Sequence, residues 1–538
     1  MNGTRGEAAA PDQPGAGEAR APRRRLALST LIFALATGLS RILGLVREIV
    51  AAYYFGAAGR INAFTVAFQI PNLVRALVAD AALSSAFVPV FSELMEKGER
   101  KRAWRVASSL FWLMLLGLTG LTALFVVVAP WIIDLFGNPG GDRALAVSLS
   151  RILFPIVALL GVSGIVVGIL NSYDEFTIPA LTPVFWNLAI IAGLAIGVPH
   201  VHGIDAKLYV YAVSILIGTL IQVLLPIPWL RGKDGTLQLV LDWRDPAVRQ
   251  VFVLMVPVTI SLGLINFNAV VDTFFASRLI DPNLSPNAID KAFRIYMLPQ
   301  GMFSVAVATV LFPTLSRAAA RGDLDAFRDT VARGLRQIAF LLVPASVAAA
   351  VLAEPIVRLL YQRGAFTGRQ TTVVAGALAA FAAGLTFNGT MLLLNRAFFS
   401  LQSNWIPTGI ALGNLALNAA LDAAFYRFGT WGLPLSTSVV NVAGTAALLW
   451  VLRDRVGRLD LAATARASAL ITVAAAALAG VSYGVWRGLD DAVGRSLGAQ
   501  VVSLTVALGA GLLAYGVACR FLGVRELQTL LQLRRRAT

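Results

Sequence analysis

The sequence is poor in the residues that build disulfides, metal sites and soluble surfaces. It contains one cysteine and two histidines in 538 residues, and only 14% of its residues are charged. A lone cysteine, Cys519, can form neither an internal disulfide nor a cysteine-based metal site. The histidines, His200 and His202, stand in a short predicted loop and would not share a face of a helix, so they do not indicate a metal site either.

Motifs of the common enzyme classes are also missing. The chain has no G-x-x-x-x-G-K-[ST] loop to hold the phosphates of ATP and no H-E-x-x-H helix to bind zinc. The adjacent acids Asp490 and Asp491 fall in a predicted loop, where carboxylates are solvated. These absences argue against an enzyme, and uphill transport would have to draw on an ion gradient or the membrane potential.

Apolar sequence dominates what is present. Hydrophobic residues make up 57% of the chain, and runs of about 18 to 30 apolar residues recur between residues 27 and 522. Such a run crosses about 30 Å of hydrocarbon as a helix, which pairs the backbone amides without water. We therefore predict an all-α membrane protein with about 14 transmembrane helices. The predicted spans are 27–55, 62–94, 104–129, 146–171, 179–199, 207–230, 247–277, 289–316, 326–352, 371–399, 406–426, 431–452, 463–485 and 497–522.

The formal net charge of +16 is distributed by topology. Lysine and arginine gather before the first predicted span, after the second, sixth, eighth and twelfth spans and in the C-terminal tail, whereas loops after odd-numbered spans are poorer in them. The positive-inside rule then places both termini in the cytoplasm. No soluble segment carries a basic stripe with interleaved aromatics, so we expect membrane lipid and no nucleic acid as a partner.

An internal repeat organises the chain. Phe68-Gln69-Ile70-Pro71 resembles Tyr296-Met297-Leu298-Pro299, and Leu170-Asn171 resembles Leu394-Asn395, at an offset of roughly 224 to 228 residues. The repeat contains six spans, an even number, so both halves enter the membrane from the same side and form two parallel lobes around a central cavity. The predicted parts are a disordered cytoplasmic tail (1–25), a first lobe (26–230), a second lobe (247–453), an appended helix pair (463–522) and a cytoplasmic tail (523–538).

Ionisable residues inside the first span are functional candidates, because a charge in hydrocarbon requires a cavity or a partner. The run SRILGLVRE holds Ser40, Arg41, Arg47 and Glu48. Arg41 and Glu48 lie two helical turns apart and share a face, about 10 Å apart along the axis. Arg47 points elsewhere and is expected near the outer end, where its long side chain can snorkel to the interface. A structural ion pair with a neighbouring helix is the alternative role for Arg41.

Arginines recur beside matching prolines in the two lobes. Asn72 and Arg75 line one face of the second span, Asp80 follows, and Arg294 precedes Pro299 in the eighth span. A cleft with arginines on both walls attracts an anion. Guanidinium groups pair bidentately with phosphate oxygens, so we expect a phosphate or diphosphate headgroup as the ligand.

A second group of polar residues lies in the later spans. Asp272 stands in the seventh span, Asn414 and Asn418 share a face of the eleventh, and Thr437 begins the twelfth. One carboxylate with several neutral oxygens fits a small cation such as Na⁺. Hydrogen bonding between the helices is the alternative explanation for these polar residues. We expect no other cofactor.

Long motifs resemble those of one transporter family. SRILGLVRE from Ser40, AYYFG from Ala52, AFTVAFQIPNLVRAL from Ala63 and LSSAFVPVFSE from Leu83 are similar to the MurJ (MviN) lipid II flippase family, within the multidrug/oligosaccharidyl-lipid/polysaccharide exporter superfamily. The resemblance covers about residues 26–525 and implies export of undecaprenyl-diphosphate-linked disaccharide-pentapeptide, lipid II, during peptidoglycan synthesis.

The resemblance also implies roles for residues. It assigns the diphosphate to Ser40, Arg41, Arg47, Arg75 and Arg294, the sodium site to Asp272, Asn414, Asn418 and Thr437, and the polyprenyl tail to a groove of the last two helices. It implies a monomer beside the cell-wall synthesis machinery.

The chain departs from the family pattern at four charged positions. It has Asn62, Glu48, Asp80 and Phe293 where relatives often have Asp, Asp, Glu and Asp. A flippase for another polyprenyl-diphosphate-linked saccharide, a cation-coupled drug antiporter and a membrane-embedded scaffold or glycolipid enzyme are the alternatives. Transport of lipid II without chemical change would distinguish a lipid II flippase from these alternatives.

Overall fold

The structure is a computed structural model that describes residues 20–78, 81–403, 405–457, 459 and 461–528. Within these ranges the chain is helical and contains no strand. Ten of the described helices, some of them with a break, are long and apolar enough to cross a membrane. Each of the fourteen predicted spans coincides with a helix or a pair of consecutive helices, which confirms the all-α membrane fold.

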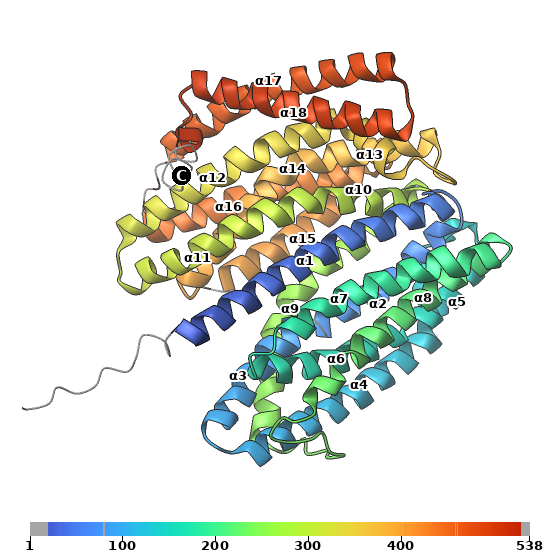
Figure 1. Cartoon of the computed structure of the whole chain (residues 1–538), viewed down its shortest axis with the longest axis vertical. Helices are drawn as coiled ribbons and strands as arrows, with labels where there is room; N and C mark the ends of the chain where they lie inside the picture. The colour runs from blue at the N-terminus through green and yellow to red at the C-terminus, as the bar shows by residue number, and fades with distance from the viewer. Residues whose placement is uncertain (1–19, 79–80, 404, 458, 460, 529–538) are drawn as a thin grey trace, which may run out of the picture.

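The first eight α-helices form one group, here called the N-lobe (Figure 1). Its buried core is made by apolar side chains such as Phe64, Leu149 and Phe154, packed between α2, α5 and α8. The helices of the N-lobe are α1 (Arg20–Phe55), α2 (Ile61–Val78), α3 (Ala81–Glu96), α4 (Arg100–Leu135), α5 (Arg143–Leu153), α6 (Pro155–Ser172), α7 (Thr177–Ala192) and α8 (Ile204–Leu224).

The next eight α-helices form the second group, the C-lobe. The helix α9 lies at the junction, because it packs on α2 and α3 of the N-lobe and on α15 of the C-lobe. The helices of the C-lobe are α9 (Pro246–Phe275), α10 (Ser285–Pro299), α11 (Val305–Ala320), α12 (Leu324–Val351), α13 (Ala353–Tyr361), α14 (Gly368–Ser400), α15 (Trp405–Phe425) and α16 (Gly432–Val456).

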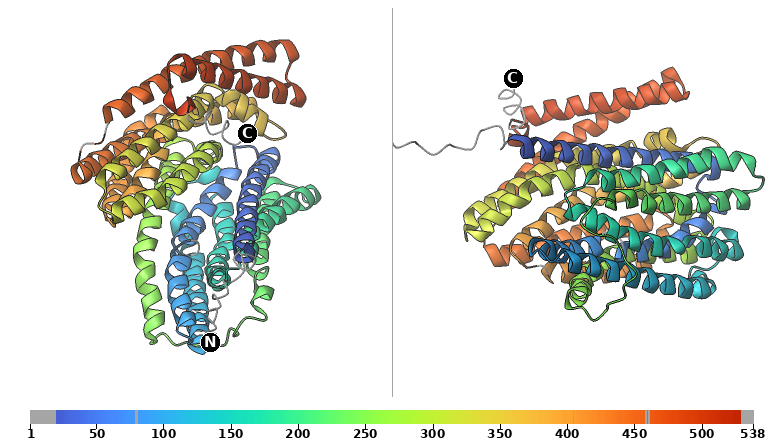
Figure 2. Two further views of the ribbon diagram at one scale, coloured as in Figure 1. Left: turned by 60° about the vertical axis from the view of Figure 1, so that its left-hand side comes forward. Right: turned by 60° about the horizontal axis from the view of Figure 1, so that its bottom comes forward.

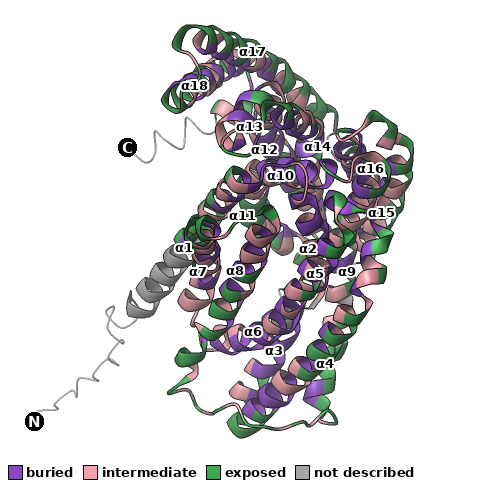
Figure 3. Cartoon of the chain, turned by 90° about the vertical axis from the view of Figure 1, so that its right-hand side faces the viewer, coloured by how far each residue is buried: buried purple, intermediate pink, exposed green. Residues whose placement is uncertain are grey.

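The last two helices, α17 (Leu461–Val493) and α18 (Leu497–Phe521), pack on each other and on the outside of α12 (Figure 2). Their contact with the C-lobe includes Tyr515, whose hydroxyl donates to the carbonyl oxygen of Phe340 at 2.9 Å. Large apolar side chains on the outer faces are exposed, for example Leu513 at 73% and Phe521 at 87%. Figure 3 shows exposed residues along α4, α17 and α18, as expected of helices that face lipid.

One predicted boundary changes, and one predicted span contains an irregular turn. The helix α1 begins at Arg20, inside the segment predicted as a tail up to residue 25, because arginine and alanine are good helix formers and the helix extends beyond its apolar part. The predicted span 289–316 contains a π-helical turn, Gln300–Ser304 (η6), between α10 and α11, directly after Pro299. The predicted span 62–94 lies on α2 and α3, and residues 79–80 between them lie outside the described residues.

Close helix packing in the C-lobe depends on a glycine of α14. The hydroxyl of Ser438 in α16 donates to the carbonyl oxygen of Ala380 in α14 at 2.6 Å. A Cβ placed on Gly384 would lie 2.6 Å from Cα of Ser438, so the backbones of α14 and α16 approach without room for a side chain.

We expect Gly384→Ala to lower the free energy of unfolding by about 1–3 kcal/mol, because overpacking moves backbone rather than a flexible side chain. Thermal unfolding of the detergent-purified protein, followed by tryptophan fluorescence, measures it. The control is Gly376→Ala on the same helix, where a Cβ meets its nearest neighbour, Cβ of Trp431, at an ordinary 3.9 Å. Equal melting temperatures for the two variants would contradict the packing argument.

Candidate functional site

A buried charge cluster connects the two lobes. Glu48 of α1 lies 2.8 Å from Nη2 of Arg47 and 3.8 Å from Nζ of Lys291 in α10. Arg47, Glu48 and Lys291 are 8%, 7% and 2% exposed, so water contributes little to their solvation. One carboxylate thus faces two cations, and one of them belongs to the other lobe.

Arg47 has a different environment from the one predicted. Its Nη1 donates to Oδ1 of Asn187 in α7 at 3.2 Å, and its guanidinium lies 4.7 Å from the ring centre of Trp186. The expectation that Arg47 snorkels to the interface is wrong, because α7 offers an amide and an aromatic face and Glu48 supplies the counter-charge. Ser40 enters the same network through its carbonyl oxygen, which accepts from Nδ2 of Asn187 at 3.4 Å.

The arginine of the eighth predicted span lies at the same interface. Arg294 forms an ion pair with Asp290 one helical turn before it, at 3.2 Å, and its side chain is 37% exposed. It lies one helical turn after Lys291, whose ammonium faces Glu48 across the lobes. Arg41 of α1 faces the following turn of the C-lobe, because a Cβ on Gly301 of η6 would lie 2.2 Å from its Nη1. Arg41 and Arg294 therefore follow one interface, between α1 and the interrupted helix α10–η6.

Arg75 is held on its own helix. Its Nη2 and Nε lie 3.0 and 3.3 Å from Oδ1 of Asn72, as the three-residue spacing predicted. Asp80, which was predicted with them, lies outside the described residues. The contacts of the structure bring Arg47, Glu48 and Lys291 together and place Arg41 beside η6, whereas a chamber shared by all four arginines stays a prediction.

Hydrogen bonds between the lobes collect at the end of the molecule formed by the loops after odd-numbered predicted spans. Asn62, which is fully buried, accepts from the backbone amide of Asn287 at 2.9 Å and donates to the carbonyl oxygen of Asn283 at 2.7 Å. The backbone adds two bonds, from Gly59 to Asn283 at 2.6 Å and from Gly140 to Pro282 at 2.9 Å. An amide at position 62 serves here as donor and acceptor, a function that an ionised aspartate could not perform.

A second polar site lies between α9 and α15. Nδ2 of Asn418 donates to Oδ1 of Asp272 at 2.8 Å and to Oδ2 of Asp422 at 2.9 Å. Asn418 and Asp422 are 1% and 0% exposed, and Oδ1 of each has no hydrogen-bond partner. Buried carboxylate and amide oxygens without donors are the ligands that a hard cation takes, so the residues fit Na⁺.

The predicted cation ligands are only partly brought together. Thr437 lines a pocket of about 120 Å³ together with Asp272 and Asp290. This pocket therefore lies between the Asp272–Asn418–Asp422 site and the interface that holds Arg294. Asn414 lies against α16 instead, since a Cβ on Gly444 would be 2.4 Å from its Nδ2. Among the described residues no group of three or more histidine, cysteine or acidic side chains gathers as a transition-metal site would.

Sequence reasoning missed Lys291, Asp290, Asp422 and the buried role of Asn62. Three of these were open to the rule already applied, because Asp290, Lys291 and Asp422 are ionisable residues inside predicted spans. Asp422 is also four residues after Asn418 and shares its face. Asn62 gave no such signal, because a neutral amide at the start of a helix is ordinary until its partners from the other lobe are known.

The fold and these sites define a class: a multi-pass membrane transporter with two parallel helical lobes and ionisable side chains between them. The family described as "Lipid II flippase MurJ" matches residues 51–489. The "Lipid II flippase MurJ" of Burkholderia cenocepacia is 31% identical over 428 residues, covering 78% of this chain and 82% of its own. The "Probable lipid II flippase MurJ" of Vibrio cholerae is 30% identical over 93% of this chain and 97% of its own. The chain belongs to the lipid II flippase MurJ family.

Solved structures agree with this assignment. A structure titled "Lipid II flippase MurJ, inward closed conformation" has a TM-score of 0.75 and 25% identity, covering 91% of this chain and 99% of its own. An inward-facing multidrug resistance MATE family transporter of the MOP superfamily has a TM-score of 0.65 at 15% identity, covering 80% of this chain and 98% of its own, and it shares the fold alone. The family is one of transporters.

We expect Glu48→Gln to destabilise the protein by about 3–5 kcal/mol, because it removes the buried carboxylate that Arg47 and Lys291 share. Lys291→Met should cost about 1 kcal/mol or less, since Glu48 keeps Arg47. The double variant should be more stable than Glu48→Gln alone. Melting temperatures in detergent measure the three changes, and equal losses for the two single variants would contradict this account of the cluster.

Proposed function

We propose that this protein flips lipid II from the cytoplasmic to the periplasmic leaflet of a bacterial inner membrane, with both termini in the cytoplasm. The observation that carries the proposal is the line of cationic side chains along the α1–α10 interface, Arg41, Arg47, Lys291 and Arg294, which comes from both lobes. The names of the relatives, lipid II flippases, supply the substrate.

The physical problem of flipping is the polar headgroup. A diphosphate carries charge that hydrocarbon cannot solvate, whereas an undecaprenyl chain is apolar and dissolves in the hydrocarbon core. Guanidinium groups at an interface between lobes replace water around the phosphate oxygens with charge-assisted hydrogen bonds. Arg41 and the partly exposed Arg294 are the groups best placed to receive it, because Arg47 is committed to Glu48 and Asn187.

Alternating access requires that the lobes separate at one end while they stay joined at the other. The hydrogen bonds of Asn62, Gly59 and Gly140 join the lobes at the end that the charge distribution assigns to the periplasm. In the proposed cycle the headgroup enters from the cytoplasmic end, loads the arginines and weakens the Glu48–Lys291 attraction by competing for the cations. The periplasmic hydrogen bonds then open, and the headgroup leaves on that side.

A cation at the Asp272–Asn418–Asp422 site fits this cycle as the coupling ion. Asn418 and Asp422 belong to α15, and Asp272 belongs to α9, the helix that packs on both lobes. Each elementary charge that crosses the membrane potential supplies about 2.3 kcal/mol per 100 mV. A bound Na⁺ would offset the charge of one of the two carboxylates, and a pocket lined by Asp272 and Asp290 lies between this site and the arginine interface.

We expect Arg41→Ala and Arg294→Ala each to abolish growth of a strain depleted of its own lipid II flippase, and to lower lipid II translocation in proteoliposomes at least about 10-fold, because each removes a charge-assisted phosphate contact. Arg294→Lys should keep part of the activity. Arg321→Ala, an exposed arginine outside the interface, is the matched control, and size-exclusion profiles verify folding. Full growth with Arg41→Ala and Arg294→Ala would refute the phosphate role.

We expect Asp422→Asn to remove the dependence of translocation on a sodium gradient, because one carboxylate of the cation site becomes neutral. Initial rates in proteoliposomes with and without the gradient give the ratio, which should fall to about 1 in the variant. Asp491→Asn, an exposed carboxylate of α17, is the control. An unchanged ratio in Asp422→Asn would exclude this site from coupling, while leaving lipid II transport itself in place.

A further inference from the structure

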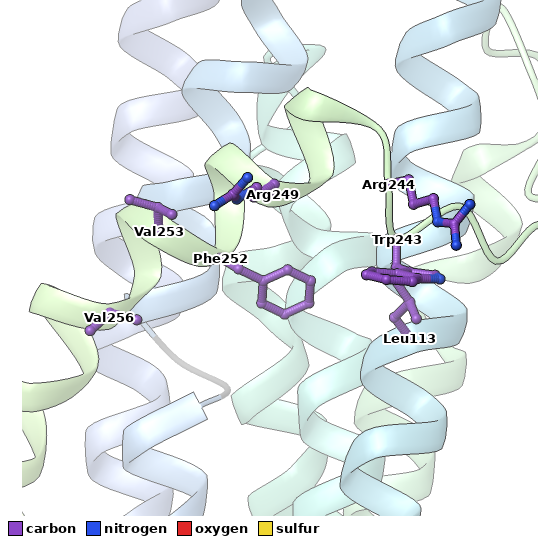
Figure 4. Close-up of a pocket in the computed structure, with 7 residues that line it drawn as sticks. All are labelled: Leu113, Trp243, Arg244, Arg249, Phe252, Val253 and Val256. Carbon is purple, nitrogen blue, oxygen red and sulfur yellow. The ribbon is translucent and has the colours of Figure 1, made fainter.

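A second group of arginines lies where the segment after α8 joins α9, away from the α1–α10 interface. Arg244 and Arg249 border a pocket of about 600 Å³, here called the α4–α9 notch, on the outer surface (Figure 4). The remaining lining residues are apolar or aromatic: Leu113 of α4, Trp243, and Phe252, Val253 and Val256 of α9.

These two arginines differ from their neighbours in being without a counter-charge. Three arginines of α4 that face the same connecting segment, Arg100, Arg102 and Arg105, pair with its acids at 3.0, 3.4 and 3.5 Å. In the part of the chain that the structure describes, no carboxylate pairs with Arg244 or Arg249, and Arg244 only lies 5.2 Å from the ring centre of Trp243. Both side chains are exposed, so a ligand can reach them.

The notch is charged at one level and apolar at the next. Figure 4 shows both guanidinium groups above Leu113, Phe252 and Val256 in its view. Along α9, Val256 lies seven residues after Arg249, a rise of about 10 Å toward the middle of the membrane. Val253 and Val256 are 61% and 55% exposed, and on α4 Leu116 is 56% exposed, so these faces meet lipid.

This order of groups matches one kind of molecule. A ligand must offer an anion to the two guanidinium groups and an apolar chain to the α9 face below them. Trp243, 65% exposed beside the arginines, is the residue type that marks the boundary between headgroups and hydrocarbon. A free phosphate would leave the apolar wall unused, and a nucleic acid could not enter the membrane.

We propose that the α4–α9 notch binds an anionic glycerophospholipid of the surrounding bilayer, with its phosphate between Arg244 and Arg249 and one acyl chain along Phe252, Val253 and Val256. Basic pockets between helices on the cytoplasmic side of membranes suit such headgroups. The bound lipid would fix the connecting segment against the start of α9, where the two lobes meet in sequence.

The test is native mass spectrometry of the full chain, released from detergent with dioleoyl-phosphatidylglycerol or dioleoyl-phosphatidylethanolamine. The wild type should retain phosphatidylglycerol preferentially, and Arg244→Gln/Arg249→Gln should bind it about 30-fold more weakly, which is about 2 kcal/mol at a factor of ten per 1.4 kcal/mol. The matched control, Arg317→Gln/Arg321→Gln, removes two exposed arginines of the C-lobe and should change retention little.

Four outcomes would overturn the proposal. Equal losses in the two double variants would indicate attraction by overall charge, and equal retention of both lipids would exclude an anionic site. Competition by sn-glycerol 3-phosphate at the same concentration as the lipid would indicate a site for the free anion. Tighter retention of lipid II than of phosphatidylglycerol at the notch, lost in Arg244→Gln/Arg249→Gln, would assign it to the substrate.

A second measurement locates the acyl chain of the bound lipid. Phosphatidylglycerol with a photoreactive acyl chain should label residues 252–256 in the wild type, and this labelling should disappear in Arg244→Gln/Arg249→Gln. Trp243→Ala should weaken it severalfold without loss of folding, because the side chain is exposed. Labelling spread evenly over the lipid-facing helices would contradict a defined site.

Discussion

The structure depends on how a few charges are compensated where water is scarce. At the interface between the lobes, Glu48 is shared by Arg47 of its own helix and Lys291 of the other lobe, while Arg294 pairs with Asp290 of its own helix. At low dielectric an unpaired charge costs several kcal/mol, so the lobes are held together as long as the carboxylate is shared. An anion that enters this interface offers the cations another partner. The same electrostatics therefore stabilise the joined state and make it sensitive to a phosphate group.

The two lobes repeat the same helices but not the same charges. The helices that begin the N-lobe bring arginines to the interface, whereas α9 and α15 bring Asp272 and Asp422 to a site of their own. The C-lobe interrupts its second helix directly after Pro299, at the turn Gln300–Ser304 that Arg41 faces. An interrupted helix frees backbone groups and allows small changes of direction, which a rigid helix would resist. The architecture thus holds two separate groups of charged side chains, the cations of the α1–α10 interface and the acids between α9 and α15.

The sequence predicted the helices well because the signal is physical and local. Length and hydropathy alone located every predicted span on a helix, since a bilayer leaves the backbone few alternatives. The local pairs were also within reach: Asn72 and Arg75, three apart, do form a hydrogen bond. The sequence did not predict which side chains from distant helices contact each other. Arg47 was expected at the membrane surface, but Asn187 and Trp186, about 140 residues later, hold it inside, and no spacing rule contains that information.

Asn62, where the resemblance suggested an aspartate, shows why a departure from a pattern cannot be judged from sequence alone. Loss of an acid suggested loss of an ion pair, yet no cation is among the hydrogen-bond partners of Asn62 in the described chain; they are backbone groups of Ala57, Gly59, Asn283 and Asn287. The two N–H groups of the amide are shared among three carbonyl oxygens and its oxygen accepts one N–H, whereas an ionised carboxylate could accept from Asn287 but would repel the carbonyls. Asn62 therefore forms a neutral joint between the lobes. This joint depends on hydrogen bonding, whereas the interface at Glu48 depends on charge, so the two contacts between the lobes respond to different chemistry.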